Sequence, residues 1–461
     1  MSQKPSIPQG TRDFGPTEVL QRKYVLNCIE HAFQKAGFMP IETPSMENLS
    51  TLTGKYGSEG DQLLYKILNS GDFIKKVNEQ EGNQASEKIE LNSKKILPLI
   101  AEKGLRYDLT IPFARYVVMN RNDIQFPFKR YQMQPVWRAD RPQKGRYREF
   151  WQCDGDIIGS DSLINEFELI AIYDEVFHAL KIPVSIKINN RKILSALAVA
   201  CGSENYLNTI AIAIDKLDKI GFEKVVEELQ NENLNEDAIA KIKQYLQLPK
   251  GIESLSNLEM ICNNNEHFQK GKEEILELLS YLKNRINGTI ELDFNLARGL
   301  GYYTGTIVEV QANAGSLKMS IGGGGRYDNL TNIFGLTGVS GVGISFGLDR
   351  ICDVLHELNL YPNNIQAKKS IILFCHFEKE GQMIGLDYTI ACRKNNIAAE
   401  VYPALTKKIG KQLDYANALG IPYVAIIGEN EIKENKITLK NLKTGTQEEL
   451  SFSDFLKKHQ P

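Results

Sequence analysis

The residues best able to do chemistry gather between positions 137 and 152. This stretch holds four arginines and a lysine around a turn that contains Pro and Gly: Arg138, Arg141, Lys144, Arg146 and Arg148. A guanidinium group is planar, always charged and suited to binding phosphate through two parallel hydrogen bonds. The flanking Phe150 offers a flat face on which a base can stack. We therefore expect a polyanionic ligand here. The alternative is a solvated basic loop, which is what most runs of charge are.

The segments on either side of this loop must position it. Alternating side chains predict one strand at 128–136 and a second at 150–158, so the arginines lie on an antiparallel hairpin. On the second strand Gln152, Asp154 and Asp156 fall on one face, because successive residues of a strand point to opposite sides. Apolar and aromatic residues flank them in sequence, which indicates a lined pocket, although a polar face can also be simply solvated.

Two further segments carry candidate binding groups. Asp108 and Thr110 are two residues apart, so on a strand both would face the same side and could hold an ammonium group. A turn-forming aspartate is the alternative. The run 322–325 is all glycine, which lets the backbone approach a ligand closely, and Tyr327 can add a hydroxyl. A flexible turn would also explain the glycines, and no Walker-type phosphate loop occurs in the sequence.

Several of these segments resemble the signature motifs of one enzyme family. The hairpin resembles the second motif of class II aminoacyl-tRNA synthetases, and Arg-Pro-Gln-Lys-Gly-Arg-Tyr-Arg-Glu-Phe at 141–150 is similar to its histidyl-tRNA synthetase version. Arg-Gly-Leu-Gly-Tyr-Tyr at 298–303 and the segment 322–328 resemble the two motifs specific to histidyl-tRNA synthetases. The segments 37–44 and 341–350 resemble the first and third class II motifs. The resemblance covers nearly the whole chain.

The resemblance implies roles for the cationic residues. Arg138 and Arg298 would be the catalytic residues, which clamp the α-phosphate of ATP. Arg146 and Arg350 would hold the outer phosphates, and Phe150 would stack on adenine. Mg²⁺ would bridge the phosphates, as phosphoryl chemistry usually requires. We expect no metal ligands from the protein, because none of the six histidines shows a ligand spacing.

The resemblance also implies a set of residues that bind the substrate histidine: Asp108, Thr110, Gln152, Asp156, Tyr302, Tyr303 and Tyr327. Among them, Asp108 and Thr110 would take the α-amino group, and Asp156 would pair with the imidazole N–H. Gly301 departs from the family pattern, since an acidic residue is usual there. The resemblance implies that such an acid would orient Arg298 or the tyrosines.

The expected architecture has two domains. Residues 1–365 are expected to form an α+β class II synthetase catalytic domain, an antiparallel sheet with helices. Apolar residues at i, i+3 and i+4 predict a helical insertion at about 191–285. The resemblance implies that this insertion clamps the acceptor end of tRNA, and a stabilising subdomain is the alternative. Strands and helices alternate from 370 onward, which predicts a C-terminal α/β anticodon-binding domain at 366–461.

Length and composition limit the number of domains and the cellular compartment. A chain of 461 residues is long enough for two or three domains, and its net charge of −2 gives no global attraction to nucleic acid. No apolar run reaches the roughly 18 residues that a membrane span needs, and the first six residues lack an apolar signal core. Seven cysteines without a Cys-x-x-Cys pair indicate a reducing compartment. We therefore expect a cytoplasmic protein that does not bind membranes.

The function implied by the resemblance is that of a histidine–tRNA ligase. L-histidine and ATP would form histidyl-adenylate, and the histidyl group would pass to the 3′ end of tRNA(His). The segment 37–44 implies a homodimer. The alternative is a non-catalytic, synthetase-like regulatory subunit of ATP phosphoribosyltransferase. Such proteins lack the anticodon-binding domain and typically lose catalytic arginines, whereas Arg138, Arg298 and Arg350 are present here.

Overall fold

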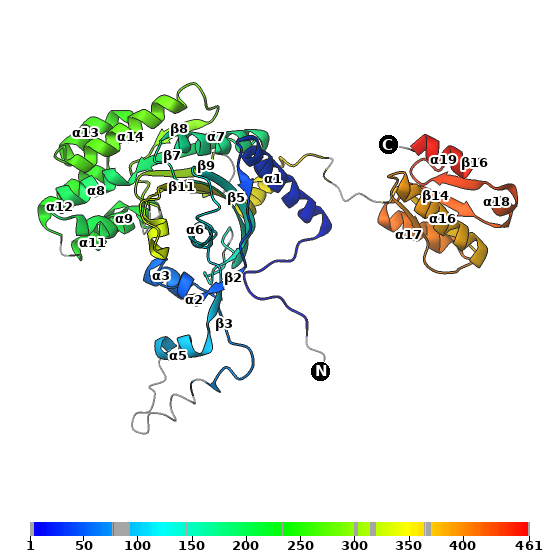
Figure 1. Ribbon diagram of the computed structural model, residues 1–461. Coiled ribbons are helices and arrows are strands. Elements are labelled where there is room, and N and C mark those ends of the chain that lie inside the picture. The colour runs from blue at the N-terminus through cyan, green and yellow to red at the C-terminus, as the bar shows by residue number, and fades with distance from the viewer. Residues whose placement is uncertain are drawn as a thin grey trace. The chain divides into compact units, whose positions relative to one another are not determined.

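The computed structural model describes residues 4–75, 77, 93–143, 145–232, 234–298, 303–313, 320–363, 365 and 370–459 (Figure 1). The chain divides into two compact units, Met1–Asn363 and Asn364–Pro461. Among the described residues, no helix is both long and apolar enough to cross a membrane.

An eight-stranded sheet forms the centre of the first unit. Its strand order is β1-β5-β6-β11-β10-β9-β7-β8. The strands are β1 (Met39–Pro40), β5 (Phe128–Trp137), β6 (Glu149–Ile158), β11 (Gly341–Gly347), β10 (Ser320–Tyr327), β9 (Thr306–Ala312), β7 (Val184–Asn190) and β8 (Thr289–Leu292). All pairs from β5 to β7 are antiparallel, and only the outer strands β1 and β8 pair in parallel. The predicted antiparallel sheet is therefore confirmed.

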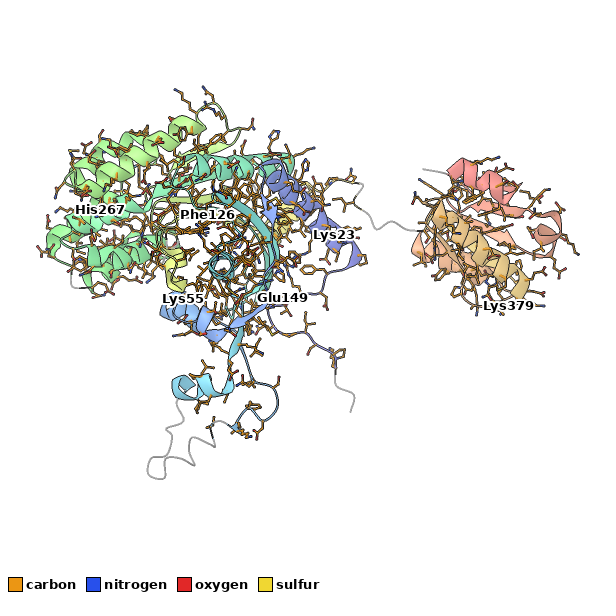
Figure 2. The ribbon with its side chains drawn as sticks, in the orientation of Figure 1. Lys23, Lys55, Phe126, Glu149, His267 and Lys379 are labelled. Atoms are coloured by element: carbon orange, nitrogen blue, oxygen red, sulfur yellow. The ribbon has the colours of Figure 1, made fainter. Side chains whose placement is uncertain are left out.

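The basic hairpin has the predicted form. Strands β5 and β6 pair over their full length, with Arg130 opposite Asp156 and Gln132 opposite Asp154. Figure 2 labels a residue near each end of the hairpin, Phe126 just before β5 and Glu149 at the start of β6.

Helix α1 (Pro16–Lys35) covers one face of this sheet. Two features stabilise the start of this helix. Pro16 suits the first turn, and the Glu18 carboxylate accepts the Gly15 N–H at 2.8 Å. Its Phe33 is fully buried and stacks on Tyr131 of β5, with ring centroids 5.5 Å apart. Helices α7 (Ile164–Ala179) and α15 (Leu348–Glu357) pack in the same hydrophobic core.

The pleat of β6 separates the helix-covered face from the pocket face. A Cβ atom on Gly155 would lie 2.1 Å from the Phe33 ring, so residue 155 faces α1 and must be glycine. Gln152, Asp154 and Asp156 therefore point to the other face of the sheet. The sequence predicted this shared face correctly.

A smaller sheet precedes the hairpin. It pairs β2 (Met46–Asn48), β4 (Lys103–Leu105) and β3 (Lys66–Ile67), and two short helices, α2 (Leu49–Leu52) and α3 (Gly57–Gln62), lie in the same segment. Helix α5 (Ser93–Ile100) comes just before β4 in the chain. Residues 76 and 78–92 lie outside the described residues.

The segment around 191–285 is helical, as its apolar periodicity predicts. Its helices cluster together in green in Figure 1: α8 (Arg191–Ala200), α9 (Leu207–Asp215), α10 (Leu217–Ile220), α11 (Phe222–Gln230), α12 (Glu236–Leu246), α13 (Leu255–Ile261) and α14 (Glu266–Leu282). Asparagine side chains cap three of them at the N-terminus, from Asn190, Asn235 and Asn265.

The second unit is a five-stranded sheet with helices. Its order is β13-β12-β14-β15-β16, from β13 (Ala399–Val401), β12 (Ile372–His376), β14 (Tyr423–Ile427), β15 (Ile437–Asn441) and β16 (Gln447–Leu450). The first three strands are parallel, and the alternation from 370 onward did not predict the antiparallel β15 and β16. The helices are α16 (Lys379–Lys394), α17 (Ile409–Leu419), α18 (Glu429–Glu434) and α19 (Phe452–His459). The α/β class of this unit is confirmed.

Candidate active site

A cavity of about 590 Å³ opens on the pocket face of the large sheet. This volume lies within the range of about 300–1,000 Å³ that is usual for small-molecule sites. Eleven residues predicted from the sequence line it: Asp108, Thr110, Arg138, Arg146, Phe150, Gln152, Asp156, Arg298, Tyr303, Tyr327 and Arg350. Tyr302, and Gly301 beside it, lie outside the described residues.

Four guanidinium groups line one part of the cavity: Arg138, Arg146, Arg298 and Arg350. Arg350 is held by two carbonyl oxygens, those of Gly145 and Ser320, each at 2.9 Å. Burial lowers the pKa of Arg350, and repulsion from the other three arginines lowers it further. A ligand with several negative charges would relieve this repulsion.

Arg138 is held between aromatic rings. Its Nε donates to the Tyr107 carbonyl at 3.0 Å, and its guanidinium carbon lies 4.3 Å from the Tyr107 ring centroid and 5.2 Å from that of Phe150. These contacts fix the direction of the guanidinium group before any ligand arrives.

Arg298 has a different environment. Its Nη1 donates to the Ser320 hydroxyl at 3.0 Å, and its Nε forms an ion pair with Glu309 of β9. Glu309 thus supplies a carboxylate that orients Arg298. No pattern in the sequence identifies Glu309, because Arg298 lies outside the strands and meets β9 only in the folded chain.

The N-terminal segment holds the tip of the hairpin. The Arg148 N–H donates to the Gly10 carbonyl at 2.8 Å, and the Arg12 guanidinium lies 3.5 Å from the Tyr147 ring centroid. Arg12 also pairs with Asp349 of α15. These contacts join residues from 135 to 337 positions apart, so no spacing in the sequence could reveal them.

The structure corrects the predicted geometry of Asp108 and Thr110. They do not lie on a strand, because helix α6 (Thr110–Met119) begins at Thr110. Asp108 acts as a cap, since its carboxylate accepts the Ile111 N–H at 3.2 Å and the Tyr56 hydroxyl at 3.0 Å. Burial raises the pKa of Asp108, and Arg138 opposes that rise. Both predicted residues nevertheless line the cavity.

The floor of the cavity is a buried charged cluster on β5 and β6. Asp156 forms an ion pair of 2.7 Å with Arg130 and accepts the Tyr327 hydroxyl at 2.5 Å. Burial raises the pKa of Asp156, while Arg130 and Tyr327 lower it. A Cβ on Gly343 would lie 2.0 Å from an Asp156 oxygen, so this glycine makes room for the carboxylate. No pattern in the sequence singles out Arg130.

Two more polar residues complete the floor. Gln152 donates to the Ser345 hydroxyl at 3.0 Å. Asp154 lies between Gln152 and Asp156 on the same face and is 3% exposed. Burial raises the pKa of Asp154 to about 7, Arg130 opposes the rise, and Asp156 adds to it. The floor therefore holds two carboxylates for one buried arginine.

Comparison with known proteins identifies the chain's relatives. Residues 96–351 match the family model described as histidyl-tRNA synthetase, and residues 388–460 match that of an anticodon binding domain. The chain belongs to the histidyl-tRNA synthetase family. It is 50% identical to the histidine–tRNA ligase of Christiangramia forsetii over 98% of both chains, and 53% identical to that of Azobacteroides pseudotrichonymphae over 96% of both.

Solved structures of this family share the fold. A histidyl-tRNA synthetase from Nostoc is 29% identical, with a TM-score of 0.74 over 99% of both chains. A Bacillus halodurans protein described as an ATP phosphoribosyltransferase regulatory subunit/histidyl-tRNA synthetase has a TM-score of 0.69 at 19% identity, which shows a common fold alone. The predictions of a class II synthetase fold and of a histidine–tRNA ligase are confirmed.

Proposed function

We propose that the cavity activates L-histidine with ATP and then transfers it to the 3′ end of tRNA(His). The observation that carries this proposal is the pairing, in one cavity, of an acidic floor with a cluster of four arginines. The floor suits a cationic amino acid, and the arginines suit a triphosphate.

In the first step, a carboxylate oxygen of histidine attacks the α-phosphorus of ATP. Histidyl-adenylate forms as the bond to pyrophosphate breaks. Arg138 and Arg298 stabilise the charge that builds on the α-phosphoryl oxygens, while Arg146 and Arg350 bind the leaving pyrophosphate. The contacts of Arg138 to Tyr107 and of Arg298 to Glu309 support this assignment, because they fix both guanidinium groups in advance.

No general base is needed for this step. The carboxyl group of histidine is ionised at neutral pH, because the pKa of an α-carboxyl is about 3.5. The chain therefore contributes position and charge stabilisation. Asp108 and Thr110 hold the α-amino group, Gln152, Asp156, Tyr302, Tyr303 and Tyr327 complete the histidine site, and Phe150 stacks on adenine.

Mg²⁺ fits this site as part of the nucleotide substrate. It binds phosphate oxygens and water with few protein ligands. In the described part of the chain, no group of three or more His, Cys, Asp or Glu side chains is arranged to hold a metal. When bound, Mg²⁺ neutralises phosphate charge alongside the arginines.

In the second step, the terminal adenosine hydroxyl of tRNA attacks the carbonyl carbon of histidyl-adenylate, and AMP leaves. We assign anticodon recognition to a domain at 366–461 and catalysis to residues 1–365. The helices at about 191–285 would clamp the acceptor end. A tRNA substrate agrees with the cytoplasmic location expected from the sequence.

We also propose a homodimer. Support comes from the edge strand β1, where Met39 is 61% exposed, and from the nearby Met46, which is 54% exposed. Large apolar side chains at a sheet edge favour association.

Pyrophosphate exchange into ATP, driven by each of the twenty amino acids in turn, tests the proposed function. We expect exchange with histidine alone. Exchange with a different amino acid, or with none, would contradict the proposal.

A further inference from the structure

Asp154 is a buried carboxyl group of the cavity floor to which the resemblance assigns no role. Its side chain is 3% exposed and lines the cavity. Its Oδ1 is fully buried and, within the described part of the chain, has no hydrogen-bond partner. Buried polar atoms are usually partnered, so an orphan oxygen in a pocket points to a ligand.

Its neighbour Asp156 has an ion-pair partner and a hydroxyl donor. Arg130 and Tyr327 already engage the two oxygens of Asp156, at 2.7 Å and 2.5 Å. A carboxylate oxygen can accept a second hydrogen bond, so Asp156 stays available to a ligand. Asp154, however, has a buried oxygen that accepts no hydrogen bond within the described part of the chain.

We propose that Asp154 determines specificity by accepting one N–H of the substrate's imidazole ring while Asp156 accepts the other, so that histidine binds with both ring nitrogens protonated. This inference rests on the proposed function, since it concerns the same histidine site.

The spacing of the two acids fits this arrangement. Residues two apart on a strand and on the same face are about 6.6–6.8 Å apart along the strand. A five-membered ring with an N–H at each side can fit between two acceptors at that spacing. Room for the ring comes from Gly323 and Gly343, which lack side chains and share the pocket face with the two acids.

The charge of the floor also favours a doubly protonated ring. Arg130 supplies one positive charge for two carboxylates, and an imidazolium ion supplies the second. The buried Arg106 also attracts Asp154, but its hydrogen bonds go to the Pro135 and Thr43 carbonyls and to Gln134. The nearby Asp108 and Tyr173 bring no positive charge. The pKa of Asp154, raised to about 7 by burial, means that either the acid or the ring can bring the shared proton.

The arrangement explains how the pocket would reject other amino acids. A ring without a second N–H would leave the Asp154 oxygen unpartnered and buried. Sites built to bind a polar group reject analogues that lack it far more strongly than apolar pockets reject a missing methylene.

The test compares two buried aspartates. Asp154→Asn keeps the shape but removes the charge, and Asp174→Asn is the matched control. The Asp174 carboxylate lies outside the cavity and accepts N–H groups of Asn287 and Gly288 at 2.7–3.1 Å. Histidine Kd is measured by titration calorimetry, ATP Kd in parallel, and Tm by scanning calorimetry.

We expect Asp154→Asn to raise histidine Kd about tenfold or more, because a charge-assisted hydrogen bond becomes a neutral one. Its Tm should not fall, and its ATP Kd should stay unchanged. Asp174→Asn should show the reverse, with a lower Tm and an unchanged histidine Kd. An unchanged histidine Kd in Asp154→Asn would overturn the proposal.

A second measurement needs no variant. Histidine labelled with ¹⁵N in the ring is bound to the natural chain at pH 8, where the free ring is neutral because its pKa is about 6.5. The proposal expects both ring nitrogens to show the chemical shift of N–H, and a neutral tautomer would overturn it. Failure of the proposed function would look different, since histidine would then not bind or support exchange at all.

Discussion

The stability of the unliganded protein should depend on pH through Asp154. A buried carboxyl group whose pKa is higher in the folded chain than in the unfolded chain binds its proton more tightly when folded. Its contribution to stability is therefore fully present below the unfolded pKa of about 3.9. It is lost as pH rises to the folded pKa of Asp154, about 7. Asp154→Asn removes this loss.

The size of the effect follows from the pKa. Each pH unit between the two pKa values changes stability by about 1.4 kcal/mol, so the two units from pH 5 to pH 7 correspond to about 3 kcal/mol. The free energy of unfolding of Asp154→Asn, minus that of the natural chain, should grow by about this amount between pH 5 and pH 8. Saturating histidine should reduce the growth, because the ligand compensates the buried charge.

Urea unfolding at pH 5, 6, 7 and 8, with and without histidine, measures this difference. Asp174→Asn serves as the control for replacement of a buried aspartate, since that carboxylate lies outside the cavity. Parallel stability curves for the natural chain and Asp154→Asn would refute the reasoning.

Three other changes have distinct expected outcomes. Arg12→Ala frees the Tyr147 ring and should raise the KM for ATP in pyrophosphate exchange at saturating histidine, with partial rescue by Arg12→Lys; an unchanged KM would show that the hairpin tip needs no support. Gly343→Ala forces a Cβ against Asp156 and should cost about 1–3 kcal/mol of stability while it raises the histidine KM; a variant with normal values would show that the floor can shift. Deletion of 366–461 should spare adenylate formation but weaken tRNA charging, and undiminished charging would contradict the role given to that segment.

The sequence predicted what depends on local pattern. Alternation along 128–136 and 150–158 correctly predicted both strands of the hairpin and the shared face of Gln152, Asp154 and Asp156. Apolar periodicity correctly predicted the helices around 191–285, and residues 341–350 form the strand and helix that place Arg350.

What the sequence could not predict depends on contacts between distant segments. The ion pair of Arg130 with Asp156 arises from cross-strand register, and Arg12 reaches the hairpin through the fold. The sequence placed Asp108 on a strand because Asp108 and Thr110 are two residues apart, as on one face of a strand. In the structure Asp108 instead caps the helix that begins at Thr110. The first N–H groups of a helix have no partner within the helix, and the Asp108 carboxylate accepts one of them, that of Ile111.

The central claim is that prepositioned arginines in this cavity catalyse attack of the histidine carboxylate on ATP. Single-turnover formation of histidyl-adenylate by Arg298→Ala, with histidine Kd measured on the same preparation and Asp174→Asn as control, tests it most directly. The account predicts that adenylate formation is abolished, while histidine binding remains measurable. Adenylate formation at the rate of the natural chain would contradict it.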